Sequence, residues 1–335
     1  MGSEPASLVG MEARPGPLAG LGAAPAPLAG IEGRLPPEIA AQAESEGIAK
    51  AAQDSLTLLA LGVLGGAFIS FGAVFANVAL TGAEAVIPFG LARVVAGLVF
   101  GLGLSLVLLG GAQIFTGDVF MVMAWASGRL AARRVVRAWA LVWIGNLVGA
   151  LGTAALVFLA EHHLFGAGQV GVTALRTAEV KAALPFGRAV ALGMLCNTLV
   201  CLAIWLSLSS RLPAHRMLVT MLPIAAFVAA GFEHAVANMY FIGYGLLVKI
   251  GAASAFWLLV QLEPDGFPAL GLAGFAQNLV AVTIGNVVGG AMLVAGAYWL
   301  LYRRPRPGAA SGDAYSASWG ARNPQARDGP GRDPG

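Results

Sequence analysis

Long apolar runs without a single charge limit what this chain can fold into more than any other feature. The ranges 55–79, 138–160, 189–210 and 276–302 contain no Asp, Glu, Lys or Arg. A helix needs about 20 apolar residues to cross the hydrocarbon of a bilayer. We therefore predict four uninterrupted transmembrane helices, and hence an integral membrane protein whose surroundings are the lipid bilayer.

The composition excludes several other classes of protein. Only 11% of the residues are charged, against about 25% in an ordinary globular protein. The net charge is +3 and the basic residues lie mostly in loops and tails, so no nucleic-acid-binding face is expected. The two cysteines, Cys196 and Cys201, fall in one apolar run. They cannot form a disulfide framework or a zinc site, and we expect no metal or cofactor.

Two further apolar runs, 94–128 and 217–248, are interrupted by polar residues near their middles. A straight helix of that length would measure about 50 Å, against about 30 Å of hydrocarbon. A helix broken inside the membrane fits the length better. We therefore predict an all-α protein with six transmembrane helices, the second and fifth discontinuous. The run 251–262 is too short to cross and is expected to form an external or interfacial helix.

A repeated sequence motif indicates how the spans are related. Gly145-Asn-Leu-Val-Gly-Ala150 returns as Gly285-Asn-Val-Val-Gly-Gly290, each after a broken span. Three spans per half is an odd number, so the halves insert in opposite directions. Two inverted three-helix repeats with discontinuous helices are typical of transporters and channels.

The ends of the chain differ from its middle. Residues 1–50 and 305–335 are rich in Pro, Gly and Ala and are predicted to be disordered tails around a channel domain over 51–304. Loops on one side of the membrane carry ten basic residues and those on the other carry five, which places both termini in the cytoplasm. The ten are Lys50, Arg129, Arg133, Arg134, Arg137, Arg211, Arg216, Arg303, Arg304 and Arg306; the five are Arg93, Arg176, Lys181, Arg188 and Lys249. We expect the inner membrane, and a cytoplasmic partner for the N-terminal tail stays open.

The polar residues inside the broken spans are the candidate site. Ionisable residues within a span are costly and mark function by default, which singles out Glu233 and His234. Glu233 is the better candidate for satisfying backbone groups freed by the break. If an in-plane two-fold relates the repeats, Thr116 and His234 meet at the centre, where a hydroxyl, a titratable ring and free N–H groups suit a small anion. Asp118 is expected to cap the second half-helix.

The surroundings of this centre are apolar, which favours a weak acid as the substrate. A bare anion crosses an apolar constriction at great cost, whereas its protonated form crosses cheaply. A site that binds a weak-acid anion and lends it a proton would remove that barrier.

Seven motifs, taken together in this order, resemble the formate/nitrite transporter family over about residues 50–304. They are Pro88-Phe-Gly90, Gly111-Ala-Gln-Ile-Phe-Thr-Gly117, Ala126-Ser-Gly-Arg129, Gly145-Asn-Leu-Val-Gly-Ala150, Cys196-Asn-Thr-Leu-Val-Cys-Leu-Ala-Ile-Trp205, Gly231-Phe-Glu-His-Ala-Val-Ala-Asn-Met239 and Val282-Thr-Ile-Gly-Asn286. The resemblance implies an aquaporin-like protomer, a homopentamer with one pore per protomer, and transport of a small monovalent anion, formate first.

The same resemblance assigns roles to individual residues. It implies a central pair of Thr116 and His234, a hydrogen bond from Asn197 and an anion-attracting Lys181. It further implies an inner constriction at Leu104 and Val200, an outer constriction at Phe100, Ile114 and Phe227, and broken-helix support from Phe115, Gly117, Glu233 and Asn238. Gln113 and Asp118 depart from the family pattern, which leaves the anion open.

Other functions stay open from the sequence alone. Nitrite, hydrosulfide or a short-chain carboxylate would use the same scaffold. A water or glycerol channel is disfavoured because neither break contains Asn-Pro-Ala. An intramembrane enzyme using Glu233 and His234 is disfavoured because the chain lacks a Gly-x-Ser-Gly nucleophile motif and a His-Glu-x-x-His metal pair.

Overall fold

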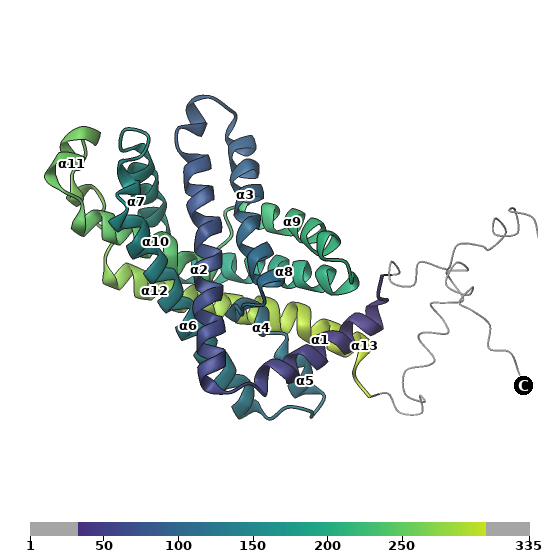
Figure 1. Cartoon of the computed structure of the whole chain (residues 1–335). Helices are drawn as coiled ribbons and strands as arrows, with labels where there is room; N and C mark the ends of the chain where they lie inside the picture. The colour runs from purple at the N-terminus through teal and green to yellow at the C-terminus, as the bar shows by residue number, and fades with distance from the viewer. Residues whose placement is uncertain (1–32, 306–335) are drawn as a thin grey trace, which may run out of the picture.

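The computed structural model describes residues 33–305, and over that range the chain is helical without a strand (Figure 1). The helices are α1 (Pro36–Ala51), α2 (Ser55–Leu80), α3 (Phe89–Gly110), α4 (Phe115–Asp118), α5 (Met121–Ala126), α6 (Ala132–Leu159), α7 (Gln169–Ala182), α8 (Phe186–Ser209), α9 (Pro213–Ala229), α10 (Ala235–Gly251), α11 (Ser254–Val260), α12 (Leu272–Val287) and α13 (Ala297–Tyr302). Short turns η1 (Ala83–Ala85), η2 (His162–Leu164) and η3 (Pro264–Gly266) lie between them, and the π-helix η4 (Val288–Gly296) joins α12 to α13.

Five segments within 33–305 are long and apolar enough to cross a membrane: α2, α3, α6, α8 and the continuous helix from Leu272 to Tyr302. The predicted second span corresponds to α3 followed by α4 and α5, and the predicted fifth span to α9 followed by α10. Since α9 and α10 have only 17 residues each, the count of six spans stays a prediction. The helix expected within 251–262 is α11, which follows α10 at a bend of 106°.

Small residues let the long helices pack closely. Helix α2 lies along α6, and α8 lies along α12. A Cβ atom at Gly149 would collide with the carbonyl oxygen of Val63, and one at Gly289 would collide with that of Met194. The backbones therefore touch at equivalent places in the two halves, as small residues permit in membrane helix pairs.

Helix α1 corrects the predicted domain boundary. Residues 36–50 were expected in a disordered tail, but α1 packs on the protein through Ile39, Ala40 and Ala43. Its Glu44 is fully buried and forms ion pairs with Arg129 (3.2 Å) and Arg303 (2.6 Å). These partners are far away in the sequence, so composition alone could not reveal them. The parts of the predicted tails over 1–32 and 306–335 lie outside the described residues.

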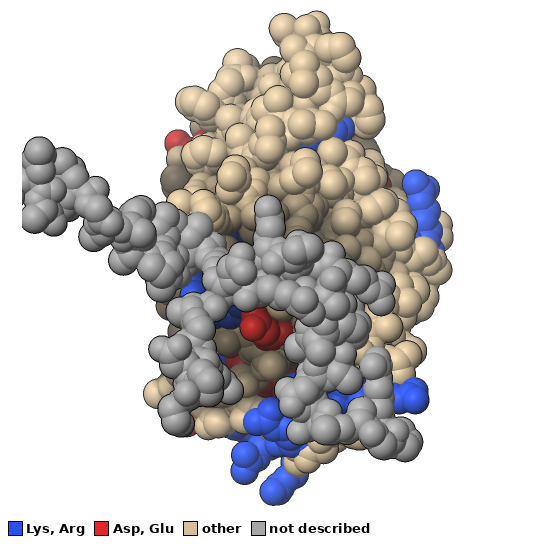
Figure 2. Space-filling model, turned by 90° about the vertical axis from the view of Figure 1, so that its right-hand side faces the viewer, with Lys and Arg blue, Asp and Glu red and all other residues tan. Residues whose placement is uncertain are grey.

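The two ends of the molecule differ in what they carry. Helices α7 and α11 lie at one end, and α1, α5 and α13 lie at the other (Figure 1). Residues 33 and 305 lie on the side of α1 and α13. Figure 2 views the molecule from that side and shows Lys and Arg side chains gathered along its lower edge. We call the end with α7 and α11 the outer end and the opposite end the inner end.

Candidate functional site

Both breaks begin with a glycine in the left-handed region. Helix α3 is followed by Gly111 (φ 73°) and α9 by Gly231 (φ 72°). The next residue in each case closes the helix end with its N–H, at 3.1 Å to the Val107 carbonyl and 3.0 Å to the Phe227 carbonyl. Glycine adopts this conformation without a steric penalty, which makes it the usual residue after a helix end.

An asparagine on α6 holds the first break. Asn146 accepts a hydrogen bond from Phe115 N–H (2.9 Å) and donates to the carbonyls of Gln113 (2.9 Å) and Gly62 (2.7 Å). Asn146 is fully buried. Backbone groups that the break frees are thus satisfied inside the protein, as a break within a membrane requires.

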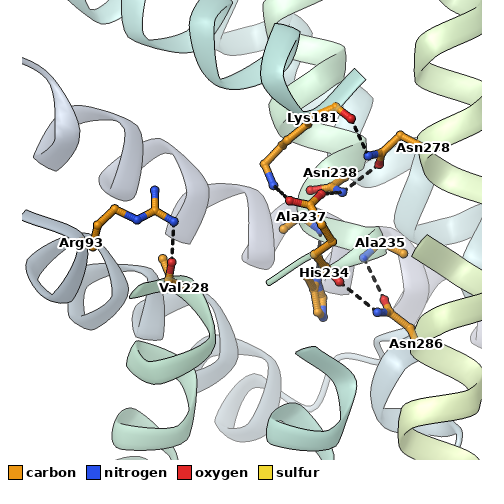
Figure 3. A network of polar contacts seen from close by, with 10 residues as sticks. Arg93, Lys181, Val228, His234, Ala235, Ala237, Asn238, Asn278 and Asn286 are labelled. Carbon is orange, nitrogen blue, oxygen red and sulfur yellow. Dashed lines mark hydrogen bonds and ion pairs between the residues drawn. The ribbon is translucent and has the colours of Figure 1, made fainter. Parts of the chain in front are cut away.

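An asparagine on α12 holds the second break in the same way. Asn286 accepts from Ala235 N–H (2.9 Å) and donates to the carbonyls of Glu233 (3.0 Å) and Gly193 (2.9 Å). Figure 3 shows this clamp beside His234. Asn146 and Asn286 are the second residues of the repeated Gly-Asn-x-Val-Gly motif. Sequence reasoning treated that motif only as a sign of repeats and missed its function in holding both breaks.

Thr116 and His234 lie 118 positions apart and meet at 2.9 Å between Oγ1 and Nε2. The other ring nitrogen, Nδ1, accepts a hydrogen bond from Ala237 N–H at 3.1 Å. A neutral ring therefore carries its proton on Nε2 and donates it to the Thr116 oxygen. The hydroxyl proton of Thr116 is then free to be donated to a third group.

A cavity of about 310 Å³ opens next to this pair. Phe100, Phe227 and His234 line its floor. The Phe227 ring stacks on His234 with centroids 5.8 Å apart, and Phe100 meets Phe227 edge to face at 5.7 Å. We call this the outer cavity because Lys181 and Arg176 of α7 also line it.

Lys181 was expected in a loop. It lies instead in the last turn of α7. One face of α7 is buried through Val170, Leu175 and Ala178. The Lys181 ammonium pairs with Glu233 at 2.8 Å.

The Lys181–Glu233 pair belongs to a closed polar network (Figure 3). Asn238 donates to the other Glu233 carboxylate oxygen (2.6 Å) and to Asn278 (2.8 Å), and Asn278 donates back to the carbonyl of Lys181 (2.8 Å). Glu233 and Asn238 therefore link the second break to Lys181 at the cavity wall.

Arg93 joins α3 to the end of α9 at the rim of the outer cavity. Its guanidinium donates to the Val228 carbonyl at 2.6 Å (Figure 3). The outer cavity thus has three cations, Arg93, Arg176 and Lys181, and the single carboxylate of Glu233 among its described lining residues. Sequence reasoning had considered only Lys181 there.

A second cavity of about 200 Å³, the inner cavity, lies toward α1. Leu104 and Ile114 line it together with Gln113. The family resemblance assigns Ile114 to the outer constriction, whereas Ile114 lines the inner cavity, on the same side as Leu104. The symmetric clamps explain the difference, because Ile114 occupies in the first break the position that His234 occupies in the second, and so faces the opposite way.

The two predicted site residues of α8, Asn197 and Val200, lie in different surroundings. Asn197 donates to the carbonyls of Thr116 (3.2 Å) and Asn286 (2.7 Å), so it joins the two halves behind the pair. Val200 is 1% exposed and belongs to the apolar core, and it lines neither of the two cavities.

The short helix α4, which carries Thr116, is held by contacts with α6, α8 and α1. Phe115 packs edge to face on Trp139 (5.9 Å), and a Cβ atom at Gly117 would press on Ile204. Asp118 forms no helix cap, contrary to expectation. Its buried carboxylate pairs with Lys50 of α1 at 2.9 Å, so the carboxylate that departs from the family pattern ties α4 to α1.

Comparison with known proteins identifies the family to which the chain belongs. The family model described as "Formate/nitrite transporter" matches residues 37–300. This chain belongs to the formate/nitrite transporter family. Formate channel FocA of Escherichia coli (strain K12) is 41% identical over 271 residues, covering 81% of this chain and 95% of that protein. Formate channel FocA of Haemophilus influenzae is 36% identical over 260 residues, covering 77% and 91%.

Solved structures of formate/nitrite transporters share the fold. A "Pentameric formate channel with formate bound" matches with a TM-score of 0.71 and 35% identity, over 75% of this chain and 98% of that one. An "FNT family ion channel" matches with a TM-score of 0.68 and 25% identity, over 80% and 99%. Since this is a family of channels and transporters, the chain is a membrane transport protein and not an enzyme.

Proposed function

We propose that this chain forms a homopentameric channel for formate in the inner membrane, with both termini in the cytoplasm and one pore through each protomer. The observation that carries the proposal is the 2.9 Å contact between Thr116 and His234, which has the outer cavity beside it and the inner cavity beyond Ile114. The named functions of the matched formate channels supply the substrate.

The anion first collects in the outer cavity, where cations outnumber carboxylates. Lys181 contributes less free charge than an unpaired lysine would because Glu233 compensates it at 2.8 Å. Arg93 and Arg176 add positive charge to the same cavity, and a field of one sign raises the local concentration of a counter-ion.

The anion then passes Phe100 and Phe227 and meets the central pair. Thr116 donates its hydroxyl proton in a hydrogen bond to the carboxylate while His234 Nε2–H donates to Thr116. This relay lets the ring support the anion through the hydroxyl. When His234 is protonated, its Nε2 proton passes to Thr116 as the Thr116 hydroxyl proton passes to the carboxylate, which leaves a neutral ring and the neutral acid. A neutral acid crosses the apolar wall toward Leu104 and Ile114 far more cheaply than an anion.

The remaining residues hold this machinery in place. Asn197 fixes the carbonyl of Thr116, and Val200 belongs to the apolar core. Phe115, Gly117, Glu233 and Asn238 support the two breaks. A lent proton returns to His234 from the substrate or from water, so the complete passage leaves the protein unchanged.

Uptake of isotopically labelled formate into proteoliposomes tests the function over a range of pH. The wild-type rate should rise as the pH falls, whereas His234→Asn should lose that dependence. Gln277→Ala, at a polar residue of α12 that lines neither cavity, is the matched control and should keep the wild-type profile. A wild-type pH profile in His234→Asn would contradict proton lending, and uptake no faster than in protein-free vesicles would contradict a formate channel.

Nitrite, hydrosulfide and short-chain carboxylates are the alternative substrates on this scaffold. Each is added in turn as an unlabelled competitor at the formate concentration. We expect formate itself to compete most strongly. Stronger competition by another anion would reassign the substrate.

A further inference from the structure

We infer that Arg216 forms an anion-collecting site in the inner cavity, where a carboxylate pauses on the inner side of the constriction. The inference rests on the proposed function and deepens it, because it gives the pore a binding station that neither the motifs nor the relatives' names assign. The site lies between α9, which carries Arg216, and the backbone of the first break.

Arg216 is the cation of this cavity that lacks a carboxylate partner. The other lining cation, Lys50, is paired with Asp118 at 2.9 Å. Over residues 33–305, no carboxylate forms an ion pair with Arg216. Its Nε is buried and has no hydrogen-bond partner among the residues that the structure describes.

A buried N–H of this kind is costly unless a ligand or water satisfies it, although the residue as a whole is only half-buried. A small carboxylate matches its fork of N–H donors, which bind two oxygens at once. The structure thus offers a donor set for the same class of anion that the outer cavity attracts.

The neighbouring groups leave the binding of a carboxylate to Arg216, because an amide oxygen and a carboxylate are acceptors and cannot donate to an anion. The amide of Gln113 lines the cavity and is 3% exposed; its nitrogen bonds to Gln53, and its oxygen has no partner. Glu46 is the carboxylate in the cavity wall, and it accepts a hydrogen bond from Gln42 at 3.0 Å. Glu46 therefore weakens the positive potential around Arg216 without cancelling it through an ion pair.

Both ends of the pore would then attract the anion, but each would use a different set of cations. At the outer end, Lys181 is compensated by Glu233 and assisted by two arginines. At the inner end, one uncompensated arginine faces a cavity that Leu104 and Ile114 close toward the centre. Formate arriving from the inner side would be concentrated beside the constriction before it reaches Thr116.

The test is the permeability of proteoliposomes to labelled formate at low concentration, measured at two ionic strengths. At about 10 mM salt the Debye length is about 30 Å, and at about 1 M it is about 3 Å. Arg216→Gln should lower the permeability about five-fold at low salt and by less than about two-fold at high salt, because the lost effect is that of a screened charge. Arg216→Lys keeps the charge but loses the fork of N–H donors, so it should lower the permeability at low salt less than Arg216→Gln does.

Two further variants separate charge in the cavity from charge elsewhere. Arg211→Gln removes an exposed arginine from the same end that does not line the cavity, and it should leave the permeability unchanged. Glu46→Gln should raise the permeability at low salt, since it removes a carboxylate from the cavity wall.

Each result is decisive for the inference. Equal permeability of Arg216→Gln and wild type at both salt concentrations would overturn the inference and leave the proposed function standing. A loss in both Arg216→Gln and Arg216→Lys that salt does not change would show a structural role and also overturn it. A wild-type protein that conducts no formate would instead refute the proposed function itself.

Discussion

At the scale of single residues, two buried asparagines determine where the pore can be polar. Asn146 and Asn286 each make two hydrogen bonds to the backbone of a break and a third to a carbonyl of a neighbouring helix. They leave Thr116 and His234 free to bond with each other instead of with the backbone ends. The Ala237 N–H donates to His234 Nδ1, so the proton of a neutral His234 ring lies on Nε2. The backbone therefore directs this proton toward Thr116.

We predict that Asn286→Ala destabilises the protein by about 2 kcal/mol or more, because the Ala235 N–H and the Glu233 carbonyl of the break lose their partner. Thermal unfolding in detergent measures the loss. Asn77→Ala is the matched control, since Asn77 is also buried but makes one hydrogen bond, to Val170 at 3.1 Å. Equal losses in the two variants would contradict the clamp.

At the scale of elements, α1 is bound to the rest of the protein by ion pairs near its middle and in its last turn. Glu44 pairs with Arg129 and Arg303, and Lys50 pairs with Asp118 on α4. The second pair reaches a helix only four residues long that carries Thr116. Movement of α1 would therefore strain the element that holds half of the central pair.

Lys50→Met tests this coupling because it leaves the buried Asp118 carboxylate without its partner. We expect a loss of about 2–3 kcal/mol, at the low end for a buried pair because the Lys50 side chain is 35% exposed. The double variant Lys50→Met, Asp118→Asn should recover most of the stability, measured by thermal unfolding. Strictly additive effects of the two substitutions would show that the pair does not couple α1 to α4.

Sequence reasoning reached the elements that composition alone specifies. Uncharged runs predicted the long helices, and excess length predicted where α3 and α9 end. It missed α1 and α7, whose polar residues resemble those of a tail and a loop. Their buried faces become visible only when partners such as Arg303, 259 positions from Glu44, are brought to them. The side on which Ile114 lies was missed for a similar reason, since it depends on how the two breaks face each other.

At the scale of the whole molecule, two similar halves form a proposed pore whose outer and inner cavities differ. The clamps and helix ends repeat closely, but the repeat places Ile114 opposite His234 and gives the outer cavity more charge. The chain therefore has a symmetric scaffold and an asymmetric path. We expect the apolar wall near Leu104, and not the charged outer cavity, to be the main barrier to an anion.

The most direct test of the central claim is a jump in external formate applied to proteoliposomes that hold a pH dye. Entry of formate together with a proton should acidify the interior rapidly, and His234→Asn should abolish the acidification. Formate uptake that follows the membrane potential without any change of internal pH would contradict proton lending by His234, and no uptake at all would contradict the channel.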